Sequence, residues 1–271
     1  MEVCRQFSGR WGIFLKTQGG VFIQQIRVKP IGDSALSVIF GSDINEEMLN
    51  RIISLKRLME AECGSGRLRG VRELLPTYGA LNVFYDPQFI TWREMEEQIT
   101  GLLERITNVV KYRLIRIPVC YGGDLGPDLA AAASLAAMTE EEFVTLHSET
   151  DYLIYMPGGQ PGQAHLSHLN PRLVFKEPDR PDADLLEGSI WIAGRQTGIS
   201  TACFSGPQFR IGMTPIQPYN IRRRPAVLYE AGDRIRFIPV SADEYEQIRA
   251  DWRVGIYQCR ITEEGGCVDG N

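Results

Sequence analysis

Residues 156–201 constrain the fold more than any other stretch of the chain, because they join a turn-rich loop to a short apolar strand. The loop contains the sequence Pro-Gly-Gly-Gln-Pro-Gly, which begins at Pro157. Glycine permits backbone with positive φ and close approach to a ligand, whereas proline stiffens the chain between such turns. The segment Ser189–Ala193 then has the composition of a buried strand. The pattern predicts a β scaffold that carries functional groups on its loops.

A polar turn is expected after this strand, with Gln196 and Thr197 between Gly194 and Gly198. Side-chain and backbone donors in such a turn are suited to bind a carboxylate, an amide or a phosphate. An equally good interpretation is a glycine-rich β-barrel corner without a ligand, in which the two side chains only complete the turn's own hydrogen bonds. Arg172 is a candidate anion partner because guanidinium matches carboxylate and phosphate geometry, with a surface ion pair as the alternative.

All histidines of the chain lie between positions 147 and 168, and His165 and His168 have the spacing His-x-x-His. Two imidazoles at this spacing can share a metal ion, but no acidic or cysteine ligand follows at a supporting interval. The better interpretation is two loop histidines that face solvent. We therefore expect no resident metal.

Charge and composition narrow the class of protein. A formal net charge of −5 argues against binding to duplex nucleic acid. No apolar stretch approaches the roughly 18 residues that span a bilayer, and basic residues interrupt any secretory signal at the N-terminus. The six cysteines are scattered without a Cys-x-x-Cys pair, which is typical of reduced thiols. These features predict a cytoplasmic protein that binds neither nucleic acid nor membrane.

The first half of the chain predicts a small open sheet with two helices on one face. A helix is expected from Ser42 or Asp43, and Thr91 with Glu94 forms a capping box for a second helix. Strands are expected at 26–29, 35–40, 71–75 and 80–85, with a further strand at 111–119 that leaves this domain.

The second half of the chain has a different pattern of residues and predicted elements. A turn cluster and two short helices are expected between residues 121 and 147, the second helix opened by a capping box of Thr139 and Glu142. Short strands then alternate with Gly/Pro turns, which is typical of a β-barrel or sandwich. The predicted organisation is an N-terminal extension of unknown role at 1–25, an α+β domain at 26–115, a β-barrel domain at 116–260 and a tail at 261–271.

Ordered motifs along residues 26–248 resemble one family, which contains the 5-oxoprolinase B subunit, allophanate hydrolase subunit 1 and the sporulation kinase inhibitor KipI. The motifs that carry the resemblance are 31–36, 118–123 with 126–129, 146–148, 170–173, 188–189, 192–194 with 196–199, 212 with 214–215, and 232–237.

The resemblance implies an α+β fold, with a small N-terminal ββαββα domain and a C-terminal cyclophilin-like β-barrel. It also implies a homologous sister subunit, of the type of allophanate hydrolase subunit 2 or the oxoprolinase C subunit, and a third subunit of the oxoprolinase A type. In the oxoprolinase, this assembly opens 5-oxoproline in an ATP-dependent reaction. A related module belongs to the carboxyltransferase part of urea carboxylases. The implied cofactor is ATP at the level of the complex, with no metal beyond the Mg²⁺ that accompanies it.

The chain departs from the family pattern mainly in the loop after Met156. Gly159, Gln163 and His165 stand where the family has two phenylalanines and a tyrosine, and Asp184 and Met213 replace two usual arginines. Because scaffold positions are retained while pocket positions change, the chain is expected to have an altered substrate or reduced catalysis.

The sequence therefore predicts a subunit of a 5-oxoprolinase-like, ATP-dependent amide or lactam hydrolase that is inactive without its sister subunit. The alternative is a non-catalytic regulator that binds a histidine kinase, as KipI does. The resemblance selects no nucleophile, and the expected substrate or phosphate contacts are Tyr121, Arg172, Gln196, Thr197, Thr214, His165 and His168.

Overall fold

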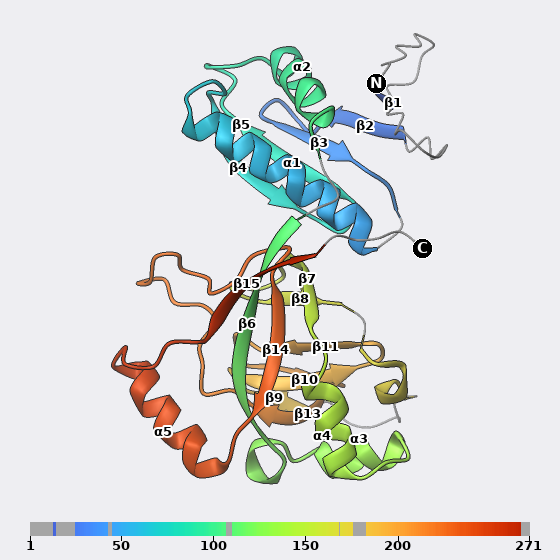
Figure 1. Ribbon diagram of the computed structural model, residues 1–271, viewed down its shortest axis with the longest axis vertical. Helices are drawn as coiled ribbons and strands as arrows, with labels where there is room; N and C mark the ends of the chain where they lie inside the picture. The colour runs from blue at the N-terminus through green and yellow to red at the C-terminus, as the bar shows by residue number, and fades with distance from the viewer. Residues whose placement is uncertain are drawn as a thin grey trace. The chain divides into compact units, whose positions relative to one another are not determined.

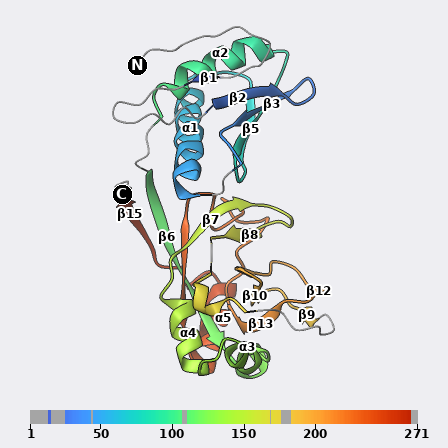
Figure 2. The same cartoon turned by 90° about the vertical axis from the view of Figure 1, so that its right-hand side faces the viewer.

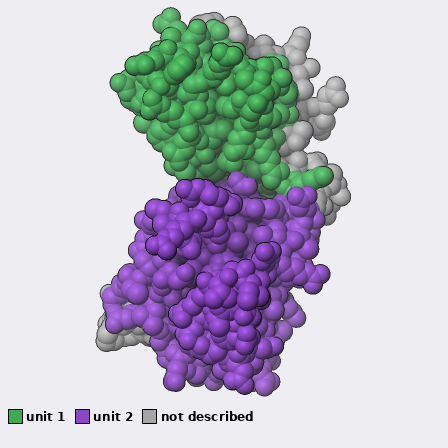
Figure 3. Space-filling model, turned by 90° about the vertical axis from the view of Figure 1, so that its left-hand side faces the viewer, with its two compact units in different colours: residues 1–111, 265–271 green, residues 112–264 purple. Residues whose placement is uncertain are grey.

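The computed structural model describes residues 13–14, 25–42, 45–106, 110–167, 169–175 and 183–266. They divide into two compact units, residues 1–111 with 265–271 and residues 112–264 (Figure 1, Figure 3). The boundary falls inside one long strand, β6 (Val110–Tyr121). Most of the N-terminal extension and residues 267–271 lie outside the described residues.

Unit 1 is an antiparallel sheet covered on one face by two helices (Figure 2). Its strands have the order β1-β2-β3-β5-β4, and α1 and α2 share one hydrophobic core with alternate residues of β2, β3 and β5. Because successive strand side chains point to opposite faces, this shared core places both helices on the same side of the sheet. The elements are β1 (Ile13–Phe14), β2 (Gln25–Pro30), β3 (Ala35–Ile39), α1 (Glu46–Gly64), β4 (Val71–Pro76), β5 (Ala80–Tyr85) and α2 (Trp92–Leu103).

The helix starts in unit 1 follow local capping chemistry. Thr91 and Glu94 form the expected capping box of α2, in which each side chain accepts the other residue's backbone N–H. The expected cap of α1 is wrong for Ser42, since Asn45 takes that place and Asp43 lies outside the described residues. The Asn45 side chain accepts the backbone N–H of Met48 at 2.8 Å, which satisfies one of the donors exposed at a helix start.

Unit 2 is built on a curved sheet that nearly closes into a barrel. Among the described residues its order is β11-β10-β13-β6-β14-β7-β8, and β15 also pairs with β6. The two end strands, β8 and β11, lie in contact and bring the sheet almost to closure. The α+β class with a barrel-like sheet is thus confirmed. The strands are β7 (Tyr152–Pro157), β8 (Ala164–Leu166), β10 (Ser189–Ala193), β11 (Gln196–Ile199), β13 (Phe209–Met213), β14 (Arg234–Pro239) and β15 (Ile261–Gly266).

Helices and short elements complete unit 2. The second expected capping box, Thr139 with Glu142, opens α4. The helices are α3 (Leu129–Leu135), α4 (Glu140–Ser148) and α5 (Ala242–Arg253), with 3₁₀ turns η1 (Gly123–Leu125) and η2 (Pro171–Leu173), and β9 (Ala183–Leu185) pairs with β12 (Phe204–Gly206). In the described part of the chain, no helix is long and apolar enough to cross a bilayer.

The structure corrects the expected tail at residues 261–266. Residues 261–266 form β15, which pairs with β6, and the backbone N–H of Arg116 donates to the carbonyl of Arg260 at 3.0 Å. The Arg116 side chain also donates to the Thr262 hydroxyl at 3.0 Å. These partners are remote in sequence, so local composition gave no sign of the strand.

Separate folding of the two units is a testable prediction. Each unit has its own hydrophobic core, which is the condition for independent folding. A fragment of residues 110–266, which keeps β6 and β15 intact, should remain monodisperse and unfold cooperatively in a thermal scan. Aggregation of this fragment under conditions in which the whole chain stays folded would contradict two autonomous domains.

Candidate functional site

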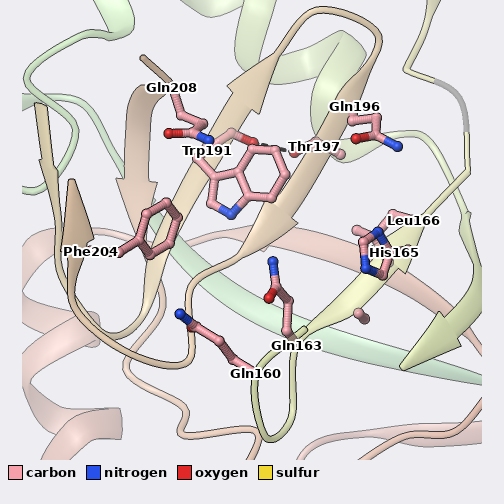
Figure 4. A pocket seen from close by; sticks show the side chains of 10 residues that line it. Gln160, Gln163, His165, Leu166, Trp191, Gln196, Thr197, Phe204 and Gln208 are labelled. Atoms are coloured by element: carbon pink, nitrogen blue, oxygen red, sulfur yellow. Dashed lines mark hydrogen bonds between the residues drawn. The ribbon is translucent and has the colours of Figure 1, made fainter. Parts of the chain in front are cut away.

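A cavity of about 300 Å³ lies where the two end strands of the barrel meet (Figure 4). Its walls come from the loop between β7 and β8, from β8 itself, from the β10–β11 hairpin and from the segment around β12. The residues that line it are Gln160, Gln163, Ala164, His165, Leu166, Trp191, Gln196, Thr197, Phe204 and Gln208.

The loop between β7 and β8 is held in one shape by its glycines. Gly159 and Gly162 have φ of 85° and 78°, a region that side chains other than glycine rarely adopt. A Cβ atom on Gly162 would lie 2.5 Å from the Cβ atom of Tyr219. The Tyr229 hydroxyl also donates to the carbonyl of Gly162 at 2.5 Å. The loop thereby presents Gln160 and Gln163 to the cavity (Figure 4).

The expected polar turn is shorter than the sequence indicated. Ala193 pairs with Gln196, so only Gly194 and Arg195 form the turn, and Gly194 has φ of 54°. Gln196 and Thr197 therefore belong to strand β11, not to a turn bracketed by glycines. A two-residue connection with positive φ at its first position matches the twist of paired strands, which explains why the ladder continues through both residues.

Gly198 creates the space that the Trp191 side chain occupies. The two residues are directly paired across the hairpin, and a Cβ atom on Gly198 would lie 2.6 Å from Cζ2 of the indole. Ile190 and Ile192 belong to the barrel core, so strand alternation directs Trp191 to the opposite face. The residue is only 8% exposed, yet its Nε1 has no hydrogen-bond partner among the described residues.

A buried hydrogen-bond chain leads from the cavity wall into the barrel. The Thr197 hydroxyl donates to the carbonyl of Trp191 at 2.9 Å, so its oxygen accepts from Nε2 of His147 at 2.9 Å. The Tyr121 hydroxyl then donates a hydrogen bond to Nδ1 of the neutral imidazole at 2.8 Å. Burial lowers the pKa of His147 to about 3 and raises the pKa of Tyr121, because charge is disfavoured in the barrel interior.

The structure brings three of the sequence-selected residues to the cavity, namely His165, Gln196 and Thr197. Tyr121 lies behind it in the buried chain. Arg172 is exposed on η2, and Thr214 is buried with its hydroxyl accepting the backbone N–H of Ile216 at 3.2 Å; neither lines the cavity. His168 lies outside the described residues. A ligand contact by any of these residues stays a prediction.

Sequence reasoning did not select Trp191, Gln160 or Gln208 as cavity residues. The one local signal was the tryptophan in a strand whose hairpin partner is glycine, since an aromatic side chain packs well over such a gap. The glutamines gave no signal because glutamine is common on exposed loops.

The lining chemistry is polar but almost free of ionisable groups. It contains glutamine, threonine, histidine and indole groups, and none of the described lining residues is Lys, Arg, Asp or Glu. Cations or a nest of backbone donors usually hold nucleotide phosphates, and the described lining residues supply no Lys or Arg side chain for that purpose. Across the described residues, no group of three or more His, Cys, Asp or Glu side chains is placed to hold a metal ion.

Comparison with known proteins identifies relatives over most of the chain. The family model of the carboxyltransferase domain, subdomain C and D, matches residues 26–229. The B subunit of 5-oxoprolinase from Bacillus subtilis (strain 168) is 30% identical over 239 residues, covering 83% of this chain and 97% of the relative.

Solved structures extend the comparison. The structure of TTHA0988 has a TM-score of 0.64 at 26% identity. The match covers 77% of this chain but only 40% of TTHA0988, which is longer. The Kluyveromyces lactis urea amidolyase has a TM-score of 0.65 at 15% identity over 90% of this chain and 16% of its own. At that identity the second likeness concerns the fold alone.

Proposed function

Since the chain belongs to the family of the carboxyltransferase domain, subdomain C and D, we propose that it is the B-type subunit of a 5-oxoprolinase-like, ATP-dependent amide or lactam hydrolase with an altered substrate. The observation that carries the proposal is the match to a 5-oxoprolinase B subunit over 97% of that relative's length. A match of this extent includes both units, and so covers more than a shared barrel.

The altered substrate is supported by where the sequence departs from the family. Gln163 and His165 line the cavity, and a Cβ atom on Gly159 would lie 2.9 Å from the Gln163 side chain. All three positions are expected to be aromatic in the family. Their replacement exchanges apolar surface for hydrogen-bonding groups at one wall of the cavity.

We further propose that other subunits supply the nucleotide chemistry. The described lining of the cavity supplies no Lys or Arg for a triphosphate, so we assign ATP with its Mg²⁺ to a partner of the oxoprolinase A type. A partner of the C type completes the hydrolase. This chain's part is to bind and orient the substrate through the cavity residues.

Co-purification tests the assembly. The chain, expressed with its own C-type and A-type partners, should elute as one complex and hydrolyse ATP only when its substrate is added. A chain that elutes alone, without either partner, would overturn the proposal. A stable complex with a histidine kinase would instead favour the regulatory alternative.

A substitution experiment tests the altered substrate. This chain should support less than about a tenth of the 5-oxoproline-dependent ATP hydrolysis that the Bacillus subtilis relative supports with the same A-type and C-type partners. The lost aromatic surface is worth several kcal/mol if it is buried against ligand or partner, which exceeds the roughly 1.4 kcal/mol of a tenfold change. Comparable turnover would show that the replacements are neutral.

The double variant Gln163→Phe with His165→Tyr is the rescue variant for that experiment. It restores two of the three expected aromatic groups and leaves Gly159 unchanged, whose φ of 85° would strain a phenylalanine. Partial recovery of 5-oxoproline turnover would assign the loss to the cavity wall. A loss of binding to the C-type partner in both proteins would assign it to assembly instead.

A further inference from the structure

We propose that the cavity binds an uncharged carboxamide or lactam, held by the indole N–H of Trp191 and the side-chain oxygen of Gln160. It would discriminate against ligands that carry a carboxylate. This inference deepens the proposed function, because it takes the same cavity as the substrate site and names the chemistry it accepts. It concerns only this chain and does not require the complex to turn over.

Two side-chain atoms that line the described cavity lack a hydrogen-bond partner, one a donor and one an acceptor. The indole Nε1 of Trp191 and the Oε1 of Gln160 are both buried, and neither has a hydrogen-bond partner in the described part of the chain. Buried polar atoms in native proteins are almost always paired, so atoms left over at a cavity mark the positions of ligand atoms. An amide group has a carbonyl for the indole and an N–H for the glutamine oxygen.

The direction of the indole N–H is fixed by packing. Gly198 leaves just enough space for the ring, since a Cβ atom there would lie 3.2 Å from Nε1 and still closer to the ring carbons. The indole nitrogen points into the cavity, toward the side occupied by Gln163 and Gln160 (Figure 4). A rigid donor of this kind loses little conformational freedom on binding and discriminates by geometry.

The absence of a fixed counter-charge argues for an uncharged ligand. Within the described part of the chain, no lysine, arginine or acidic side chain lines the cavity, and the side-chain amides present are neutral. A carboxylate that enters such a site gives up its hydration without a cation to replace it. His165 is the one lining side chain able to carry positive charge, and it sits on β8 at the edge of the cavity, apart from Trp191 on β10 (Figure 4).

The size of the cavity limits the ligand. At about 300 Å³ it lies at the lower end of small-molecule sites, which suits a single small ring or a short side-chain amide. Leu166 and Phe204 supply apolar surface for the carbon atoms of such a ring.

Three ring compounds separate the contributions in the full-length chain. 2-Pyrrolidinone offers a carbonyl and an N–H, cyclopentanone offers only the carbonyl, and 5-oxoproline adds a carboxylate to the lactam. Binding is followed by the indole N–H resonance of Trp191 in a ¹⁵N-labelled sample, assigned from Trp191→Phe. We expect saturable shifts of this resonance with 2-pyrrolidinone, and at least tenfold weaker binding of the other two compounds.

Variants test the two hydrogen-bonding groups. Gln160→Met should weaken 2-pyrrolidinone binding about tenfold, as should Gly198→Ala, because a methyl group there pushes the indole from its position. Trp252→Phe is the matched control, since its indole packs against Arg223 outside the cavity, and its binding should equal that of the unaltered chain.

Each result decides between outcomes. Equal or tighter binding of 5-oxoproline would overturn the inference while supporting an ordinary oxoprolinase subunit. Failure of 2-pyrrolidinone to shift the Trp191 resonance would overturn it whatever the complex does. Failure of the proposed function is separate, because it would appear as a lack of co-purification while 2-pyrrolidinone still binds.

Discussion

Lowering the pH from 7 to 5 should reduce the free energy of unfolding by about 2 kcal/mol through His147 alone. Burial lowers the pKa of this side chain from 6.5 to about 3, so the folded chain keeps it neutral while the unfolded chain takes up a proton below pH 6.5. The stabilisation is complete above pH 6.5 and is lost progressively toward pH 3. Denaturant titrations of the intact chain at several pH values measure it.

Among the described residues, the groups packed around His147 do not favour its charged form. Phe237 stacks on the ring with centroids 4.9 Å apart, and Tyr152 lies at 5.4 Å and donates its hydroxyl to the His147 carbonyl at 3.1 Å. Tyr121 and Thr197 occupy the two ring nitrogens. An added proton on Nδ1 would face a hydroxyl that already donates there, so the ring would have to break this bond to be charged.

Two variants isolate the contribution of His147. His147→Gln should remove about 2 kcal/mol of the difference between pH 7 and pH 5, and should be less stable at pH 7 because the Tyr121 hydroxyl loses its acceptor. Tyr121→Phe keeps the imidazole buried and should retain the pH dependence. If the unaltered chain and His147→Gln lose stability in parallel on acidification, then His147 is not the group that titrates.

Removal of Arg113 should cost about 3–5 kcal/mol of unfolding free energy, more than removal of its partner Asp233. Arg113 Nε donates to Asp233 Oδ1 at 3.0 Å, a second guanidinium nitrogen donates to Oδ2, and the Glu230 N–H donates to the same carboxylate at 2.9 Å. Asp233 is 2% exposed, whereas Arg113 is 33% exposed. Arg113→Ala therefore leaves a carboxylate that lies mostly buried, while Asp233→Ala leaves a guanidinium group that water already reaches in part.

A second ion pair, between Arg236 on β14 and Asp151, is the control for the effect of burial. Arg236 binds Asp151 at 2.6 and 2.7 Å, but both side chains are more open to solvent, at 36% and 23% exposed. Screening by water reduces such pairs to about 1 kcal/mol or less, so Arg236→Ala should be mild. Chemical denaturation of the three alanine variants measures the loss of unfolding free energy in each. Equal losses for Arg113→Ala and Arg236→Ala would show that burial does not set the cost.

Sequence alone predicted the elements whose causes are local. The capping boxes at Thr91 and Thr139 and the apolar segment Ser189–Ala193 each depend on a few neighbouring residues, and the structure confirms them. Polar caps near α1 could not be ranked from composition, because Ser42, Asp43 and Asn45 are all good candidates and only the backbone path selects one.

The candidate site was predicted only in part because long-range pairing creates it. Gln196 was selected from its turn-like surroundings, but the cavity exists because β8 meets β11 and because Gly198 stands opposite Trp191. The burial of His147 depends in the same way on Phe237, which is far away in the chain. Such partners leave no local pattern in the sequence. The barrel was indicated instead by the order of the family motifs along the whole chain.

The parallel pairing of β6 with β14 sets an order of events during protein synthesis. Leu114 pairs with Arg234 and Val119 with Pro239, so β6 emerges from the ribosome long before its parallel partner β14 has been synthesised. β2 to β5, by contrast, pair within residues 25–85 and can assemble while the rest of the chain is still being made. Contacts of large sequence separation form slowly because loop closure must precede them. We expect nascent chains that stop before residue 234 to protect unit 1 from protease while residues 112–233 remain cleavable.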